Sequence, residues 1–371
     1  MIIAIDIRPA IEEPAGIGKM ALCVTQALAN STTQHDFVLY SNVRAELGIS
    51  SSRVRWVVLR FGPGPVGRLL WHLGVILHAR LVIGVDRFVS FSSIIPAALT
   101  RDTVVLVIPD LTSVLFPEMH VNKVRWIGRL ILKRALRRAR HVIAISRNTR
   151  GDILRYAPGS VDEGRLSVIP LAYEPVFHTR AASGDTKRVR QIYKLHSPYI
   201  LFVGTIEPRK NVSALISAFG MIADDFPTHE LVIAGRRGWK WKETIETAER
   251  THVKGKIHFL HFVPQGDLPA LYKEATLFVY PSLYEGFGIP PLEAMASGVP
   301  VIASNNSSLP EVVGDAGILV DPSEPSELSD AMSRVLRDSG LRKRMARQGR
   351  QRAKSFTWER TARSFMTTLL H

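Results

Sequence analysis

Two glutamates eight residues apart, Glu285 and Glu293, are the side chains with the clearest capacity for chemistry. Glu285 lies in a glycine-bearing loop, and Glu293 follows Pro290-Pro291, a pair that is tolerated in the first turn of a helix. We expect Glu293 in that first turn, with the amides of residues 287–289 just before it. Free N–H groups at a helix N-terminus bind anions, and a nearby carboxylate accepts hydrogen bonds from hydroxyls. The segment therefore predicts a rim for an anionic, hydroxyl-bearing ligand.

Two other interpretations of this glutamate pair stay open. An acid in a first helical turn stabilises the helix dipole without any ligand, which accounts for Glu293 equally well. Two carboxylates can also form the acid and base of a glycoside hydrolase. A loop residue and a helix residue need not face one another, so the spacing alone does not argue for hydrolysis.

The glycines Gly16 and Gly18 fit neither common nucleotide motif. A Walker loop requires glycine where this chain has Glu13, and serine or threonine where it has Met20. A dinucleotide fingerprint requires a third glycine, and Ala21 takes its place. What remains is a glycine turn that opens a helix, which either offers N–H groups to an anion or is a plain tight turn.

The sequence has few of the residue patterns that bind metal ions. No Asp-x-Asp occurs, so the usual carboxylate pair that holds a divalent cation on a nucleotide diphosphate is missing. Cys23 is the single cysteine, which excludes an internal disulfide framework and a cysteine-rich zinc cluster. We therefore expect no metal cofactor, and we expect basic side chains and backbone amides to hold any anion.

An α/β framework must position these residues. Short, continuously apolar and β-branched runs, typical of buried parallel strands, recur along the chain. They lie at 2–7, 37–40, 54–59, 88–91, 104–108, 141–145, 199–203, 231–234, 256–262, 277–280, 299–303 and 318–320. Helical stretches separate many of them, and this alternation predicts a doubly wound α/β architecture.

The length of 371 residues is about twice what one ordinary α/β domain needs, which favours two domains. The alternation breaks between about 172 and 198 and restarts with the apolar run at 199. We expect an N-terminal domain over 1–175, a C-terminal domain over 190–355, and a last helix over 356–371.

The chain is basic, with 48 Lys and Arg against 33 Asp and Glu and a net charge of +15. Residues 1–150 hold 20 basic and 9 acidic residues, so the excess is concentrated in the first domain. This asymmetry predicts an anionic partner for that domain. A nucleic-acid-binding protein would account for the charge, but it would show basic patches interleaved with aromatic residues, and aromatics make up only 8%. We expect no nucleic-acid partner.

The stretch 123–140 holds eight basic residues and no acidic one, with Trp126, Leu130 and Leu136 among its apolar positions. Either it lies as a helix against an anionic membrane surface, or its apolar stripe packs on the protein's own sheet. The N-terminus lacks a basic region before a long apolar stretch, and no run reaches the ~18 uncharged apolar residues of a membrane span, the nearest being 69–79, which Arg68 and Arg80 bound. We expect a cytoplasmic protein, soluble or peripheral at the inner face of the cytoplasmic membrane.

Residues 277–321 resemble, over their full length, the glutamate-x7-glutamate segment of retaining glycosyltransferases of the GT-B fold, glycosyltransferase family four. The segments 202–211, 231–239, 262–264 and 268–275 match that family in order and spacing, and 142–146 and 168–170 match it more loosely. The resemblance implies two Rossmann-like doubly wound parallel-sheet domains that face a cleft. The first lies on the acceptor side, the second binds a nucleotide-sugar donor, and the last helix crosses back to the first.

The resemblance also implies roles for individual residues. Arg209 and Lys210 clamp the donor diphosphate in place of a metal, and Glu293 accepts hydrogen bonds from the ribose hydroxyls. Glu285 holds the donor sugar together with the amides of Phe287, Gly288 and Ile289. The remaining donor-binding positions are Gly16 and Gly18, where the backbone approaches the diphosphate, Gly204 in the diphosphate-binding loop, and Val263, which contacts the base through its backbone. The implied catalytic set is Glu285, Asp110, Arg209 and Lys210.

One position departs from the family pattern. The family often has His-Asp after the strand that corresponds to 104–108, and this chain has Pro109-Asp110. Asp110 is retained, but the imidazole that meets the donor sugar is absent, which puts that contact in doubt.

The proline-rich loop at 285–293, together with 308–311, most resembles members that use GDP-mannose on bacterial surface polysaccharides, including lipopolysaccharide. The resemblance implies metal-independent, retaining transfer of mannose from GDP-mannose to a growing or lipid-linked glycan acceptor. UDP-sugars and other GDP-sugars are the alternative donors. A GT-B sugar-nucleotide epimerase and an inactive homologue are the alternative functions.

Overall fold

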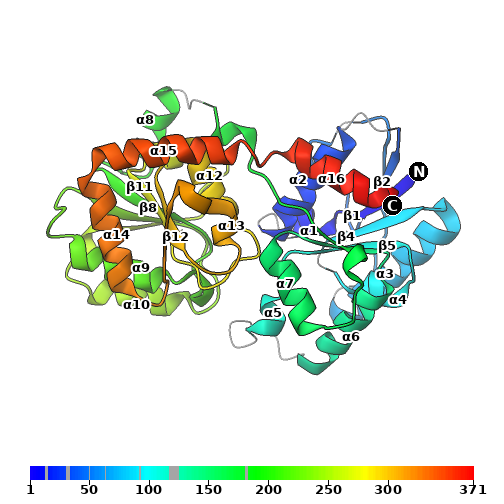
Figure 1. Cartoon of the computed structure of the whole chain (residues 1–371). Helices are drawn as coiled ribbons and strands as arrows, with labels where there is room; N and C mark the ends of the chain where they lie inside the picture. The colour runs from blue at the N-terminus through cyan, green and yellow to red at the C-terminus, as the bar shows by residue number, and fades with distance from the viewer. Residues whose placement is uncertain are drawn as a thin grey trace. The chain divides into compact units, whose positions relative to one another are not determined.

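The chain forms two compact α/β units. The computed structural model describes residues 1–12, 16–30, 34–49, 51–62, 64–91, 93–116, 125–179 and 183–371. Unit 1 comprises Met1–Leu171 and Thr357–His371, and unit 2 comprises Ala172–Phe356. Each unit has one parallel sheet with helices packed around it (Figure 1). The predicted doubly wound α/β fold is confirmed.

The sheet of unit 1 has seven parallel strands in the order β3-β2-β1-β4-β5-β6-β7. They are β1 (Ile2–Asp6), β2 (Asp36–Ser41), β3 (Val54–Val58), β4 (Arg87–Phe91), β5 (Val104–Ile108), β6 (His141–Ala144) and β7 (Leu166–Val168). The inner strand β5 is buried at every residue, as expected for an apolar run covered on both faces. The sequence predicted the first six strands but not β7, which has three residues.

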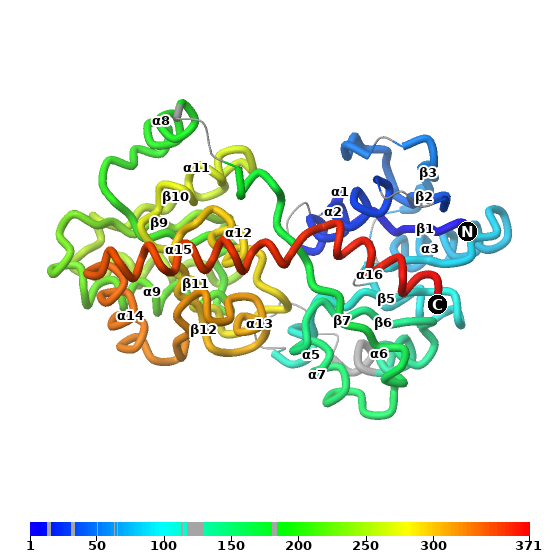
Figure 2. Tube along the Cα trace, turned by 45° about the horizontal axis from the view of Figure 1, so that its top comes forward, coloured from blue at the N-terminus to red at the C-terminus, as the bar shows by residue number. Residues whose placement is uncertain are grey.

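Helices of unit 1 connect these strands and cover the sheet. They are α1 (Arg8–Glu12), α2 (Ile17–Ala29), α3 (Gly64–Leu77) with the π-helical segment His78–Ile83, α4 (Ile95–Leu99), α5 (Thr112–Leu115), α6 (Arg125–Arg138), α7 (Arg147–Tyr156) and the last helix α16 (Trp358–Leu370). Although α16 ends the chain, it packs against α2 (Figure 2). The Thr361 hydroxyl donates to the Pro170 carbonyl at 2.8 Å, and the rings of Phe365 and Phe91 lie 6.5 Å apart.

The basic helix α6 packs part of its apolar side on its own unit. Leu132 and Leu136 are buried in the core of unit 1, and the Arg134 and Arg138 guanidinium groups donate to backbone carbonyls at 3.0 and 2.9 Å. Leu130 is 70% exposed. Residues 123 and 124 and the side chains of 125–129 lie outside the described part, so the membrane hypothesis for 123–140 stays a prediction.

One helical segment is a candidate membrane span by length and composition, although it contains the charged residues Arg68 and Arg80. Val66–Ile83 forms 18 continuous helical residues with a mean hydropathy of 1.4, long and apolar enough by composition to cross a bilayer, and 28% of it is buried. Sequence inspection had broken this stretch at Arg68 and Arg80.

The sheet of unit 2 has six parallel strands in the order β10-β9-β8-β11-β12-β13. They are β8 (Tyr199–Val203), β9 (Glu230–Ala234), β10 (Ile257–His261), β11 (Leu277–Tyr280), β12 (Val301–Ser304) and β13 (Ile318–Val320). Around them lie α8 (Ser183–Ile192), α9 (Val212–Ile222), α10 (Trp241–Arg250), α11 (Leu268–Lys273), α12 (Ile289–Ser297), α13 (Leu309–Val313), α14 (Pro325–Arg337) and α15 (Ser339–Ala353). All six strands had been predicted.

The limits of the units differ from the predicted domain limits of 175 and 190. Unit 2 begins at Ala172 and includes all of α8, of which the prediction placed only residues 190–192 in the C-terminal domain. Arg188 and Tyr193 attach α8 to the residue before α11, because both contact the Asp267 carboxylate, at 2.6 and 2.8 Å. These contacts make the segment part of the C-terminal unit.

Candidate active site

The candidate site of unit 2 lies where the strand order of its sheet reverses. β8 and β11 are neighbours, and the later strands run outward from them in opposite directions. In open α/β sheets, ligands bind outside the carboxyl ends of the strands at such a point. The loops that follow β8 and β11 meet there, because the Leu283 amide donates to the Arg209 carbonyl at 2.8 Å. The fold thus brings together residues that lie 74 positions apart in the chain.

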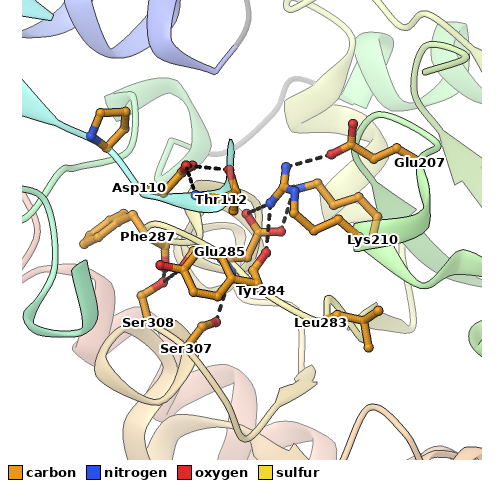
Figure 3. A network of polar contacts seen from close by, with 12 residues as sticks. Asp110, Thr112, Glu207, Lys210, Leu283, Tyr284, Glu285, Phe287, Ser307 and Ser308 are labelled. Atoms are coloured by element: carbon orange, nitrogen blue, oxygen red, sulfur yellow. Dashed lines mark hydrogen bonds and ion pairs between the residues drawn. The ribbon is translucent and has the colours of Figure 1, made fainter. Parts of the chain in front are cut away.

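Lys210 and Glu285 form a buried ion pair between these two loops (Figure 3). Lys210 Nζ lies 2.5 Å from Glu285 Oε1 and donates to the Tyr280 hydroxyl at 2.6 Å. Lys210 is 8% exposed and Glu285 is 7% exposed. The lysine ends a 3₁₀ turn that Pro208 begins, and Asn211 follows in the left-handed region with φ 54°. This tight turn aims the Lys210 side chain at the sheet edge.

Arg209 is the second cation of the site. Its guanidinium group lies 3.1 Å from Glu285 Oε2, donates to the Tyr284 carbonyl at 2.8 Å, and donates to Glu207 Oε1 at 2.7 Å. Both carboxylate oxygens of Glu285 therefore face a cation. Because an ionised carboxylate offers about four lone-pair positions, this pairing leaves acceptor capacity for a hydroxyl of a ligand.

Burial and charge act in opposite directions on this cluster. Burial alone raises the pKa of Glu285, but the neighbouring Lys210 and Arg209 outweigh it and lower that pKa to about 2. Burial lowers the pKa of Lys210, while the Glu285 carboxylate opposes that change. Glu285 is thus ionised at neutral pH, and its charge is what favours a protonated lysine in a buried position.

Two serines just before α13 fix the loop that carries Glu285 (Figure 3). The Glu285 amide donates to Ser307 Oγ at 3.0 Å. The fully buried Ser308 hydroxyl lies 2.9 Å from the Glu285 carbonyl and 2.7 Å from the Phe287 carbonyl. The position of the carboxylate is therefore set by backbone hydrogen bonds as well as by its ion pairs.

Glu293 lies deeper in helix α12 than the sequence predicted. The helix begins at Ile289, so Glu293 is its fifth residue and does not lie in the first turn. This position argues against the interpretation of Glu293 as a dipole-stabilising first-turn acid. Its side chain is buried, and the Tyr272 hydroxyl donates to Glu293 Oε2 at 3.1 Å. Burial, reinforced by the Glu293 charge, raises the pKa of Tyr272 well above its usual value, so the phenol remains a donor.

Glycines allow close backbone approach around the site. Gly288 caps the N-terminus of α12 with φ +115°, and a Cβ there would lie 2.8 Å from Leu309 Cδ2. A Cβ on Gly235 would lie 1.7 Å from the Gly204 carbonyl oxygen, so the loops after β8 and β9 approach one another only because Gly235 has no side chain. Phe287 is buried beside Phe356, with ring centroids 5.9 Å apart. The predicted 287–289 rim is therefore a tightly packed turn.

Val263 follows the irregular end of β10. The register of this strand shifts between Phe259 and His261, and His261 adopts φ 55°. Val263 is buried, whereas the preceding Phe262 is 57% exposed with the Arg236 guanidinium 4.4 Å from its ring centroid. Its predicted contact with a base stays a prediction.

Three predicted site residues belong to unit 1. Gly16 precedes α2 with φ 55° and ψ −112°, and Gly18 is buried in the first turn of that helix. Asp110 Oδ1 accepts hydrogen bonds from the Thr112 amide at 2.9 Å and from the Thr112 hydroxyl at 2.6 Å (Figure 3). Asp110 thus stabilises the start of α5, and its catalytic role stays a prediction.

Sequence reasoning missed a buried polar cluster in unit 1, where β1 and β4 form the switch point of that sheet. Arg8 Nη2 lies 3.7 Å from Asp6 Oδ2 and 3.2 Å from His72 Nε2, and the guanidinium lies 4.0 Å from the Trp71 ring centroid. Burial raises the pKa of Asp6 to about 6, against the opposing effect of Arg8. Burial, aided by Arg8 and Arg68, lowers the pKa of His72 to about 3, so its ring is neutral. The sequence offered one weak signal, an aspartate at the end of a buried strand.

The structure shows no obvious metal site in its described part. No group of three or more His, Cys, Asp or Glu side chains there is arranged to hold a metal ion. The charges that converge at the switch point of unit 2 are two cations and two carboxylates, from Arg209, Lys210, Glu207 and Glu285. Such a set suits an anionic ligand that exchanges contacts with the cations.

Comparison with known proteins shows which proteins this chain is similar to. Residues 185–352 match the family model described as Glycosyl transferases group 1. The chain is 37% identical over 253 residues to O-antigen chain mannosyltransferase B of Escherichia coli, which covers 67% of this chain and 65% of that protein. It is 30% identical over 251 residues to the Escherichia coli serotype-specific mannosyltransferase WbdA, covering 67% of this chain and 29% of that protein. The chain thus aligns with just under two thirds of the first relative and less than one third of the second.

A solved structure extends the similarity of fold to the whole chain. Anabaena Alr3699/HepE in complex with UDP and glucose superposes with a TM-score of 0.80, covering 100% of this chain and 99% of that one, at 19% sequence identity. Both sheets of this chain therefore have counterparts in a known fold, as the sequence predicted.

Proposed function

We propose that the chain is a glycosyltransferase that moves a hexose from a nucleotide-sugar donor to a glycan acceptor, because residues 185–352 match the family model described as Glycosyl transferases group 1 and the chain shares its fold with a solved structure that holds UDP and glucose. The observation that carries the proposal is the pair of adjacent cations at the switch point of unit 2, the buried Lys210 and the partly exposed Arg209. A diphosphate is the part of such a donor that requires two adjacent positive charges.

The finer proposal names mannose, carried by GDP, as the donor sugar. The two mannosyltransferases that align with two thirds of this chain support mannose. We further propose that the acceptor is a growing or lipid-linked glycan and that the anomeric configuration is retained. UDP-sugars are the competing donors.

In the proposed reaction the bond between the sugar C1 and the diphosphate oxygen breaks as the acceptor oxygen bonds to C1 on the same face. Negative charge grows on the diphosphate as this bond breaks, and Arg209 and Lys210 stabilise it by about 3 kcal/mol for each hydrogen-bond donor. The acceptor proton then passes to the departing phosphate oxygen and neutralises part of that charge. Glu293 and its Tyr272 partner hold the ribose hydroxyls, and Glu285 holds the sugar. The two cations take the role that a divalent metal has elsewhere, so we propose metal-independent transfer.

The first experiment measures binding. Thermal unfolding is followed with GDP, UDP, dTDP and their sugars, in the presence of a chelator. GDP and GDP-mannose should raise the melting temperature of the wild type, and Lys210→Ala should abolish the rise. Lys256→Ala is the matched control, because Lys256 immediately precedes β10, at the opposite end of the parallel strands.

The second experiment measures transfer. The protein is incubated with radiolabelled GDP-mannose and a lipid-linked mannan acceptor, and the anomeric configuration of the product is read by nuclear magnetic resonance. An α-linked product from the α-linked donor supports retention. Binding of GDP-mannose without transfer or hydrolysis would instead favour an inactive homologue, and interconversion of the nucleotide sugar would indicate an epimerase.

A further inference from the structure

The segment Val66–Ile83 turns an apolar face toward solvent. Its outward positions recur at helical spacing, which places them on one side of α3 and its π-helical extension. Exposed fractions are 70% for Val66, 45% for Leu69, 46% for Leu70, 36% for Leu73, 56% for Leu77, 77% for Leu81 and 68% for Val82. A surface helix normally presents polar residues on this side, so this stripe of seven large apolar side chains is an unpartnered face within unit 1. We call it the α3 face.

The opposite side of the same helix is fixed to unit 1. Trp71, Val75 and Ala79 are buried in the core, and the Trp71 indole donates to the Leu59 carbonyl at 3.0 Å. The helix also connects β3 to β4, two parallel strands of one sheet. Both of its ends must return to that sheet, so the segment cannot cross a bilayer without unfolding the unit. It can lie flat in a membrane interface.

The stretch of chain that carries the α3 face has charge of one sign. Residues 47–85 contain no aspartate or glutamate. The same stretch holds five arginines, all exposed, namely Arg53, Arg55, Arg60, Arg68 and Arg80. Arg68 and Arg80 lie within the helical segment that bears the stripe. A second copy of the chain docking through this face would bring two such positive surfaces together, which argues against self-association.

We propose that the α3 face is a docking surface for an anionic lipid bilayer, with the helix lying in the plane of the interface. The seven apolar side chains enter the boundary between headgroups and acyl chains, and the arginines contact lipid phosphates. A large apolar stripe combined with basic residues is what interfacial helices use to bind anionic membranes. The proposal assigns this role to residues 66–83, away from the basic helix α6, whose Leu132 and Leu136 are buried in the core.

Flotation of the full chain with vesicles tests the proposal. The vesicles are phosphatidylcholine alone, or phosphatidylcholine mixed with phosphatidylglycerol, at low and high salt. The variant Val66→Ser/Leu77→Ser/Leu81→Ser removes three of the most exposed apolar side chains. Its control, Ile192→Ser/Met221→Ser, removes side chains that are 54% and 62% exposed in unit 2. A second pair compares Arg68→Gln/Arg80→Gln with Lys343→Gln/Arg347→Gln, which are exposed on α15.

We expect the wild type to float with the anionic vesicles. The triple serine variant should bind them at least about tenfold more weakly, because buried apolar area drives interfacial binding. The affinity of the double glutamine variant for anionic vesicles should fall about tenfold or more, since each basic residue near an anionic surface increases binding roughly fivefold. Its affinity for neutral vesicles should change little. Both control variants should float like the wild type.

Three results would overturn the proposal. One is absence of flotation at low salt. Another is a loss of vesicle binding that appears only in the α6 variant Leu130→Ser/Lys133→Gln and not in the α3-face variants. The third is a dimer in sedimentation without vesicles that the triple variant abolishes, which would make a second copy the occupant. Flotation requires neither donor nor acceptor, so its outcome is independent of whether the proposed transfer is detected.

Discussion

Replacing Glu285 by glutamine should destabilise unit 2 strongly at neutral pH. The pKa of Glu285 falls from 4.5 to about 2 in the folded chain. A shift of one unit corresponds to about 1.4 kcal/mol, so the ionised carboxylate contributes roughly 3 kcal/mol to the free energy of unfolding. The substitution also leaves Lys210 buried without its carboxylate partner, a situation that typically costs about 3–5 kcal/mol. Both considerations point to the same magnitude.

Calorimetry of the full chain measures this effect as a shift of the transition in which unit 2 unfolds. For a unit of this size, about 3 kcal/mol lowers the melting temperature by roughly 6–12 °C. Glu207→Gln is the matched control. It removes the same charge from the same Arg209, but Glu207 is 24% exposed at its side chain, and a partly exposed pair is worth at most about 1 kcal/mol.

The dependence on pH gives the sharper test. A carboxylate whose folded pKa is lowered stabilises the protein above its unfolded pKa, and the stabilisation is lost as pH falls through the folded value. The difference between wild type and Glu285→Gln should therefore be full at pH 7 and drop below half near pH 3. A shift under about 2 °C at pH 7, or one as large at pH 3 as at pH 7, would refute this account of the ion pair.

Four further substitutions have expected outcomes. Tyr272→Phe leaves Glu293 without its phenol donor and should lower the free energy of unfolding by about 1–3 kcal/mol in urea titrations, whereas an unchanged midpoint would contradict the hydrogen bond. Asp6→Asn should stabilise the protein by up to about 3 kcal/mol at pH 7, because the raised pKa of about 6 makes wild-type stability fall as pH rises from about 4 to 6. If the stability of the wild type and that of the variant changed equally with pH, burial of the ionised Asp6 would carry no such cost. The wild type should lose stability as pH falls from about 6.5 to 3, because the His72 imidazole stays neutral in the folded protein while it becomes protonated in the unfolded one. His72→Gln should not show this loss. Acid titrations of both proteins, followed by circular dichroism, check this. Gly235→Ala places a Cβ 1.7 Å from the Gly204 carbonyl oxygen and should lower the melting temperature of unit 2 by more than 6 °C. An unchanged melting temperature would contradict the close approach of these two loops.

Strands and their order along the chain were predictable because burial on both faces of a parallel sheet requires continuous apolar runs. The three-residue strand β7 (Leu166–Val168) carries too little of that pattern to stand out. The positions of Arg209 and Glu285 at strand ends were predictable for the same reason. Their ion pairing was not, since it depends on β8 and β11 being neighbours, and a sequence does not state which strands pair.

Two features of unit 1 could not be predicted from local sequence patterns. Asp6 and His72 lie 66 positions apart, one at the end of a strand and the other inside an apolar helix, and only the fold connects them through Arg8. The α3 face has a similar origin. The segment 66–83 is apolar on nearly every side, so the sequence does not reveal which side the core covers. The burial of Trp71 decides it, and the exposed side becomes visible only then.

The geometry of Lys210 suggests why a buried ion pair occurs at this sheet edge. Within the described part of the chain, the ammonium group donates to Tyr280 and Glu285, which leaves one of its three N–H groups for a ligand. Ordering a lysine side chain costs about 1.5–2 kcal/mol of conformational entropy, and here folding has already met that cost. Glu285 also favours the charged form of the lysine against the effect of burial. A diphosphate that reaches the loop would therefore meet a cation that is already ordered and charged, which is the preorganisation that makes electrostatic stabilisation effective. By this reasoning the Glu285→Gln variant should bind GDP more weakly even where it remains folded, because its Lys210 is neither held nor kept protonated to the same extent.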